Sequence, residues 1–116
     1  MARTEIYAGD TIVLTFSLTD AVLSDFDNII AEAYTIKTNA VKFSLVEKSG
    51  FQTMEQLNTT TVRMKVLSAK SKYFSGDLFF EVAGIKGNAS IPLEQNGIGV
   101  IDTTITVKNN YIKDSI

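Results

Sequence analysis

The amino-acid sequence predicts an all-β protein whose strands form an antiparallel β-sandwich in a single domain. Two observations lead to this prediction. Apolar and polar residues alternate in one short segment after another, which is typical of strands with one buried and one exposed face. Clusters of Gly, Asn, Asp and Ser separate these segments, and no long helical periodicity runs through the chain. We therefore expect about seven short strands around one core, built by residues 1–108.

The first half of the chain contains three predicted strands. In residues 9–20, GDTIVLTFSLTD, every second residue from Ile12 to Leu18 is apolar. Residues 28–37, NIIAEAYTIK, end in β-forming residues and are predicted as the second strand, although their Ala-Glu-Ala stretch would also suit a helix. Residues 40–48, AVKFSLVEK, alternate again and form the third.

The second half contains three more predicted strands, TTTVRMKVL (59–67), GDLFFEVAG (76–84) and GVIDTTITVK (99–108), each with alternating apolar residues. Residues 51–58, FQTMEQLN, are the exception. Their apolar residues recur at helical spacing, which predicts one short helix. The single proline, Pro92, is expected in a loop.

The alternation also predicts which side chains form the core. Phe79 and Phe80 are consecutive, so only one of them can face inward, and the neighbouring apolar residues favour Phe80. Phe79 then lies on the outer face, in contact with either a loop of this domain or a neighbouring subunit. The expected core comprises Leu14, Phe16, Val62, Met64, Phe80, Val82, Ile105 and Val107.

Composition argues against several classes of function. The chain has no Cys and no His, so disulfides, zinc sites and the usual Cys-His and Ser-His-Asp nucleophile systems are not available to it. Its 11 Lys and Arg residues are scattered among 13 Asp and Glu residues, which disfavours nucleic acid as a partner. We therefore expect a protein that is not an enzyme and that needs no cofactor and no metal.

Two short motifs have some features of ligand sites. In SDFDN (24–28), Asp25 and Asp27 have the oxygen ligands that Ca²⁺ prefers, but the Gly and Glu that complete an EF-hand loop are missing. A turn is the better interpretation. GIKGN (84–88) lacks the spacing and the strand-to-helix context of a phosphate-binding loop, so we expect a hairpin turn there.

The N-terminal residues MARTEIYAGD have no apolar run, which predicts that no signal peptide is present. No stretch approaches the roughly 18 apolar residues that cross a bilayer, so we expect no membrane contact. We therefore expect a protein that is made and kept in the cytoplasm unless it leaves as part of a larger particle.

The chain has, in order, a GDT turn leading into IVLTFSLTD, then DFDNIIAEAYT, VKFSL, TTTVRMKVL, SGDLFFEVA and GIGVIDTTITV. This order resembles the immunoglobulin-like domain of tailed-bacteriophage virion proteins, above all the N-terminal domain of phage baseplate upper proteins. The resemblance covers residues 6–107 and implies an immunoglobulin-like sandwich. It also implies a non-catalytic structural role in a virion, through contacts with other virion proteins or with further copies of this chain.

Two departures from the family pattern limit what the resemblance implies. The segment 84–98 is longer than the usual link between the last two strands, and the chain has no coiled or receptor-linked region after the sandwich. An adaptor role in a baseplate therefore does not carry over, and a tail, baseplate or head auxiliary component fits equally well. The alternative is a small β-sandwich binding module for carbohydrate or peptide.

The last residues, 109–116, follow the predicted sandwich and carry Tyr111, Ile112 and Ile116 among polar residues. Such a tail can fray or form a last edge strand. It can also act as a docking arm that adds to the sheet edge of a neighbour. Together with Phe79, these three residues are the expected partner contacts.

Overall fold

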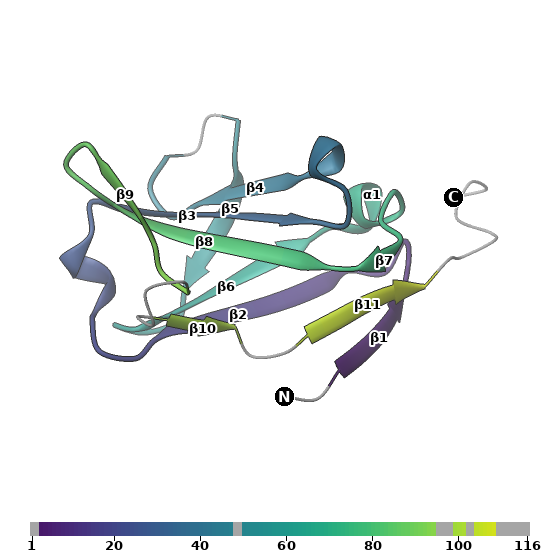
Figure 1. Cartoon of the computed structure of the whole chain (residues 1–116), viewed down its shortest axis with the longest axis horizontal. Coiled ribbons are helices and arrows are strands. Elements are labelled where there is room, and N and C mark those ends of the chain that lie inside the picture. The colour runs from purple at the N-terminus through teal and green to yellow at the C-terminus, as the bar shows by residue number, and fades with distance from the viewer. Residues whose placement is uncertain (1–2, 48–49, 95–98, 102–103, 109–116) are drawn as a thin grey trace.

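A computed structural model describes residues 3–47, 50–94, 99–101 and 104–108, which fold into an immunoglobulin-like β-sandwich (Figure 1). The fold class predicted from the sequence is confirmed. Three helical turns interrupt the strands: η1 (Leu23–Asp25), η2 (Lys37–Asn39) and α1 (Ser68–Ser71). The strands are β1 (Arg3–Tyr7), β2 (Ile12–Leu18), β3 (Asn28–Tyr34), β4 (Val41–Ser44), β5 (Gln52–Gln56), β6 (Thr61–Val66), β7 (Gly76–Asp77), β8 (Phe79–Lys86), β9 (Ala89–Pro92), β10 (Gly99–Ile101) and β11 (Thr104–Lys108).

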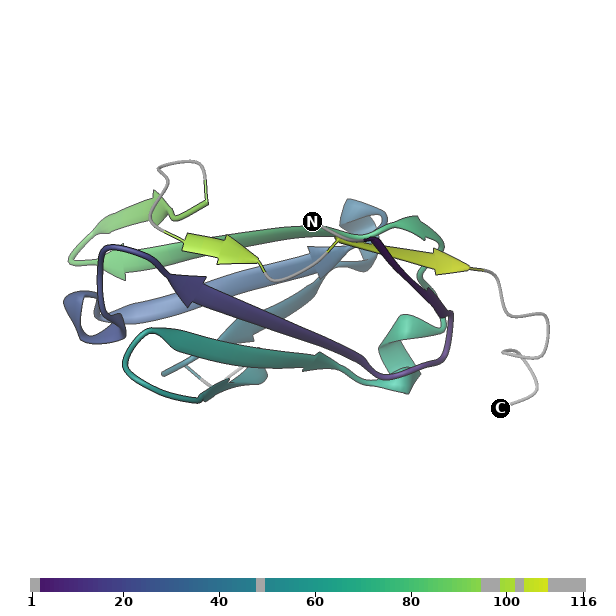
Figure 2. The ribbon, with the colours of Figure 1, turned by 90° about the horizontal axis from the view of Figure 1, so that it is seen from below.

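The strands form two sheets. The larger has the order β10-β2-β6-β5-β4-β3-β8-β9 and the smaller has the order β1-β11-β7. The larger sheet bends at the short β4–β5 pair, so that β9-β8-β3-β4 forms one layer and β5-β6-β2-β10 the other (Figure 2). Packing the inner faces of two layers against each other is the usual way in which a sandwich buries its apolar residues.

Two of the predicted strands change sheet part-way along their length. Residues 76–84 divide at Leu78, because β7 pairs with β11 whereas β8 pairs with β3. Residues 99–108 divide in the same way, since β10 pairs with β2 and β11 pairs with β1. The described residues therefore form eleven strand segments rather than about seven.

The predicted antiparallel sandwich has two exceptions. Two of the pairings within the described residues are parallel: β1 with β11, and β4 with β5. Neither pair is joined by a tight hairpin, the connection that forces neighbouring strands to be antiparallel. The pairing of β1 with β11 brings the first and the last described strands of the chain side by side.

The helix predicted for residues 51–58 is wrong, because Gln52–Gln56 form strand β5. Pairing with β6 places Met54 opposite Met64, and Met54 is buried in the core. Glu55 lies opposite Arg63, and the two form an ion pair across the strands. These tertiary contacts outweigh the helical spacing of three apolar residues.

The sequence-based assignment of inward and outward faces is largely correct. Seven of the eight predicted core residues are buried, and Phe80 is half-buried and packs against the core. Phe80 lies next to the switch from β7 to β8. The buried apolar residues between the layers include Leu14, Phe16, Ile29, Ala31, Phe43, Met54, Val62, Met64, Phe74, Val82, Leu93 and Val107.

Segment 84–98 contains the hairpin of β8 and β9, as the GIKGN motif predicted. Gly87 closes the turn with a φ of 61°, a conformation that favours glycine. Pro92 is not in a loop but ends β9, which is an edge strand in the described sheet. An edge strand tolerates proline because it has a side without ladder hydrogen bonds.

Phe16 packs closely against Gly99. A Cβ atom at residue 99 would overlap the ring of Phe16, which is fully buried. Only glycine therefore lets β10 pair closely with β2 over this ring.

The first prediction follows from this contact. Gly99→Ala is expected to lower the free energy of unfolding by about 1–3 kcal/mol, because the added methyl group overpacks the core. Urea unfolding followed by circular dichroism measures the change. The double variant Phe16→Leu/Gly99→Ala should lose less free energy of unfolding than the two single variants lose together. Strict additivity of the two losses would contradict the close contact between these residues.

Candidate functional site

The outward-facing residues of β3 and β8 form the most distinctive surface among the described residues. The two strands pair antiparallel over seven residues, with Glu32 opposite Glu81 and Tyr34 opposite Phe79. Because side chains alternate across a strand, these four residues lie on the outer side of the sheet. We call this surface the β3–β8 face and define it by Ile30, Glu32, Tyr34, Phe79, Glu81 and Ala83.

Two aromatic rings stack at one end of the β3–β8 face. The ring centroids of Tyr34 and Phe79 are 5.8 Å apart, and their planes make an angle of 26°. Stacking of this kind holds both rings in defined positions. Phe79 nevertheless keeps 54% of its surface exposed, an unusual state for so large an apolar side chain.

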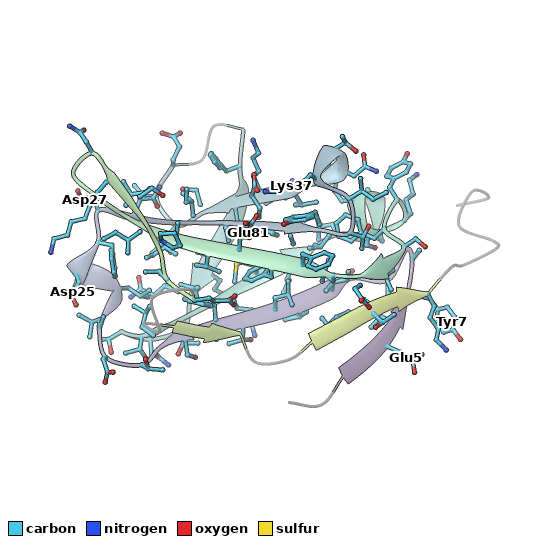
Figure 3. All side chains as sticks on the ribbon, viewed as in Figure 1. Glu5, Tyr7, Asp25, Asp27, Lys37 and Glu81 are labelled. Carbon is cyan, nitrogen blue, oxygen red and sulfur yellow. The ribbon has the colours of Figure 1, made fainter. Side chains whose placement is uncertain are left out.

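Lys37 joins the charged residues of the face. The turn η2 brings its ammonium group within 3.1 Å of Glu32 Oε2 and 2.7 Å of Glu81 Oε2 (Figure 3). The same group lies 4.7 Å from the ring centroid of Tyr34. Two glutamates directly opposite each other would repel, so the lysine between them offsets the cost of this register.

Hydrogen bonds and desolvation shift the pKa values of three groups on the face. The hydrogen bond from Lys37 to Glu81 lowers the pKa of that carboxyl group, and the contacts with Glu81 and Glu32 raise the pKa of Lys37 itself. Desolvation, followed by a hydrogen bond with Glu81, raises the pKa of Tyr34, so its phenol stays neutral at physiological pH. The face therefore offers fixed opposite charges beside a neutral aromatic pair.

A groove of about 480 Å³ continues the face beyond the aromatic pair. Apolar side chains from three strands and from the residue before β5 line part of it, among them Ile30, Phe51, Ala83 and Pro92. Charged side chains also line it, including Glu94, whose pKa is raised by desolvation. Apolar surface beside charged groups is the composition of many protein-binding grooves.

Of the predicted partner contacts, only Phe79 lies in the described part of the chain. Tyr111, Ile112 and Ile116 lie outside the described residues, as does the whole segment 109–116, so the docking arm stays a prediction. The groove and Lys37 were missed in the sequence, because both depend on strand register and on residues far apart in the chain.

The acidic motif forms turns, as predicted. Asp25 Oδ2 accepts a hydrogen bond of 3.1 Å from the N–H of Val22, and Asp27 Oδ2 accepts one of 2.8 Å from the N–H of Gly87. Figure 3 shows both aspartates at the end of the sandwich near η1. Across the described residues, no three His, Cys, Asp or Glu side chains are arranged to hold a metal ion. No helix in the same residues has the length and apolar character to cross a membrane.

The second prediction concerns pH. The pKa of Glu81 is lowered from 4.5 in the folded protein, so its pairing with Lys37 stabilises the fold above pH 4.5 and is lost as the pH falls through the folded-state value. Lys37→Gln should therefore be less stable than the parent protein at pH 7, and the difference should shrink as the pH falls below 4.5. Because the side chains are exposed, the difference is expected to be small.

Urea unfolding across this pH range measures the effect, with Lys65→Gln as a charge-matched control on the exposed side of β6. A stability difference for Lys37→Gln that does not change with pH would contradict the role given to the ion pair.

Comparison with known proteins gave no relative from which function can be transferred. No family model, no curated protein and no solved structure matches this chain.

Proposed function

We propose that this chain is a non-catalytic structural protein of a bacteriophage virion and that the β3–β8 face is one of its contact surfaces. The resemblance over residues 6–107 supports the virion assignment, and the immunoglobulin-like sandwich is the fold which that resemblance implies. Tail, baseplate and head auxiliary positions fit equally well. The absence of His and Cys from the sequence supports a role without catalysis.

The main support for this contact surface is the exposed aromatic pair of Tyr34 and Phe79. Phe79 is held by stacking on Tyr34, so its ring would lose little conformational freedom when a partner covers it. Aromatic anchors surrounded by polar residues carry much of the binding energy in protein interfaces. Here, the ion pairs of Lys37 with Glu32 and Glu81 supply the polar surroundings.

The groove extends the same surface. Phe51 and Pro92 line the groove and add apolar surface to the area that a partner would cover. A partner with a protruding apolar side chain and a complementary charge fits this combination of ring, groove and ion pairs. Other virion proteins and further copies of this chain are the partners we propose.

The third prediction tests the virion assignment. Particles from cells that carry the gene should contain the chain in a fixed ratio to the major capsid or tail proteins after density-gradient purification. Mass spectrometry of the purified particles measures this ratio. A chain that is produced in the cells but absent from every particle fraction contradicts the proposal.

The fourth prediction tests the contact surface. Phe79→Ala is expected to leave the melting temperature nearly unchanged. Its incorporation into particles should fall at least tenfold, because truncating an anchor residue typically costs about 2 kcal/mol or more of binding free energy. Cross-linking within the particles should join the β3–β8 face to a neighbouring protein.

Tyr7→Ala provides the matched control. Its ring has the same exposed fraction as that of Phe79, 54%, but it lies at the end of β1, away from Lys37 and Glu81 (Figure 3). The role of the β3–β8 face as a contact surface would be contradicted if Phe79→Ala were incorporated normally. It would also be contradicted if Tyr7→Ala lowered incorporation by the same factor.

A further inference from the structure

A second and larger cavity, of about 860 Å³, lies at the end of the sandwich where β4 begins. Three segments line it: residues 38–42, residues 50–52, and residues 69, 70, 72 and 73. Strands β4 and β5 pair only at Phe43–Gln52 and Ser44–Thr53, so the residues before these pairs diverge and the cavity opens between them. Figure 1 shows α1 at the same end of the molecule.

The wall that α1 contributes is fixed by buried contacts. Ser71 is fully buried, and its Oγ donates a hydrogen bond of 2.6 Å to the carbonyl oxygen of Asp10. Ser71 Oγ in turn accepts a hydrogen bond of 3.2 Å from the N–H of Gly9. Phe74, which follows the helix, is also fully buried. The cavity is therefore already formed in the free protein, which favours ligand binding.

The charge of this cavity is opposite to that of the protein. Lys42, Lys70 and Lys72 line it, and no described Asp or Glu does, although the chain has a net charge of -2. Lys42 has a long contact of 4.0 Å with Glu32, whereas Lys70 and Lys72 have no ion pair with any described residue. Lys70 and Lys72, without a close counter-charge among the described residues, attract an anion, and Lys42 adds a third positive charge beside them.

The neutral groups of the cavity suit a sugar. The ring of Tyr73 is 61% exposed, and the ammonium group of Lys72 lies 5.3 Å from its centroid. A flat aromatic ring of this kind can cover the apolar face of a sugar. Thr38, Asn39 and Gln52 add a hydroxyl and two amide groups, which can donate and accept hydrogen bonds to sugar hydroxyls.

We propose that this cavity binds an acidic oligosaccharide, with one sugar ring against Tyr73 and its carboxylate, sulfate or phosphate groups beside the three lysines. The volume is within the usual range for ligand sites. The proposal is independent of the virion assignment, because it uses other residues than Phe79 and Tyr34 and concerns the isolated protein.

The test is calorimetric titration of the purified chain at low ionic strength with three probes of equal length: an oligogalacturonate, a sulfated oligosaccharide and a neutral oligosaccharide. Saturable 1:1 binding of at least one acidic probe, and at least tenfold weaker binding of the neutral one, is the expected result. The double variant Lys70→Gln/Lys72→Gln should bind the acidic probe at least fivefold more weakly than the parent protein. The single variant Tyr73→Ala should show a loss of affinity of at least the same size.

The double variant Lys65→Gln/Lys86→Gln is the charge-matched control, since neither lysine lines the cavity, and it should bind like the parent protein. Poly-glutamate of equal charge supplies the comparison with an acidic peptide. The proposal is overturned if no acidic sugar binds, if the control variant loses as much affinity as the cavity variant, or if poly-glutamate binds equally well and Tyr73→Ala has no effect.

Discussion

The antiparallel register of β3 and β8 is the constraint on which the rest of the structure depends. Seven consecutive pairs, from Asn28–Ile85 to Tyr34–Phe79, decide which side chains face the core. A shift by one residue would turn Val82 outward and bury Glu81. Because burying unpaired carboxylates is costly, the sequence strongly favours the observed register. The same pairs that complete the core therefore also create the surface for which we propose a function.

That surface combines local and distant contributions. Alternation along β8 is enough to separate Phe79 from Val82, but the charged part of the face needs η2 to bring Lys37 between the two glutamates. The cavity near α1 has a similar origin, since it forms where two parallel strands diverge and a helical turn is fixed by Ser71. In both places, turns between strands supply the polar groups, and the strands supply the rigid support.

Much of the fold could be predicted from the sequence because alternation is a local signal. It identified the strands that carry Phe16, Val62 and Val82, and it placed Phe79 outside. Pairing between distant strands is not local, so the division at Leu78 and the strand at 52–56 were missed. The site was only partly predictable for the same reason: Lys37 and Glu81 are 44 positions apart and meet only through the sheet.

The absence of native cysteines allows the central claim to be measured directly by thiol labelling. Single variants Phe79→Cys and Val82→Cys would be treated with a maleimide, first as isolated proteins and then within purified particles. The register predicts fast labelling at residue 79 and slow labelling at residue 82 in the isolated protein. The proposed contact surface predicts strong protection of residue 79 after assembly. Faster labelling at residue 82 would contradict the register, and unchanged labelling at residue 79 in particles would contradict the proposed contact surface.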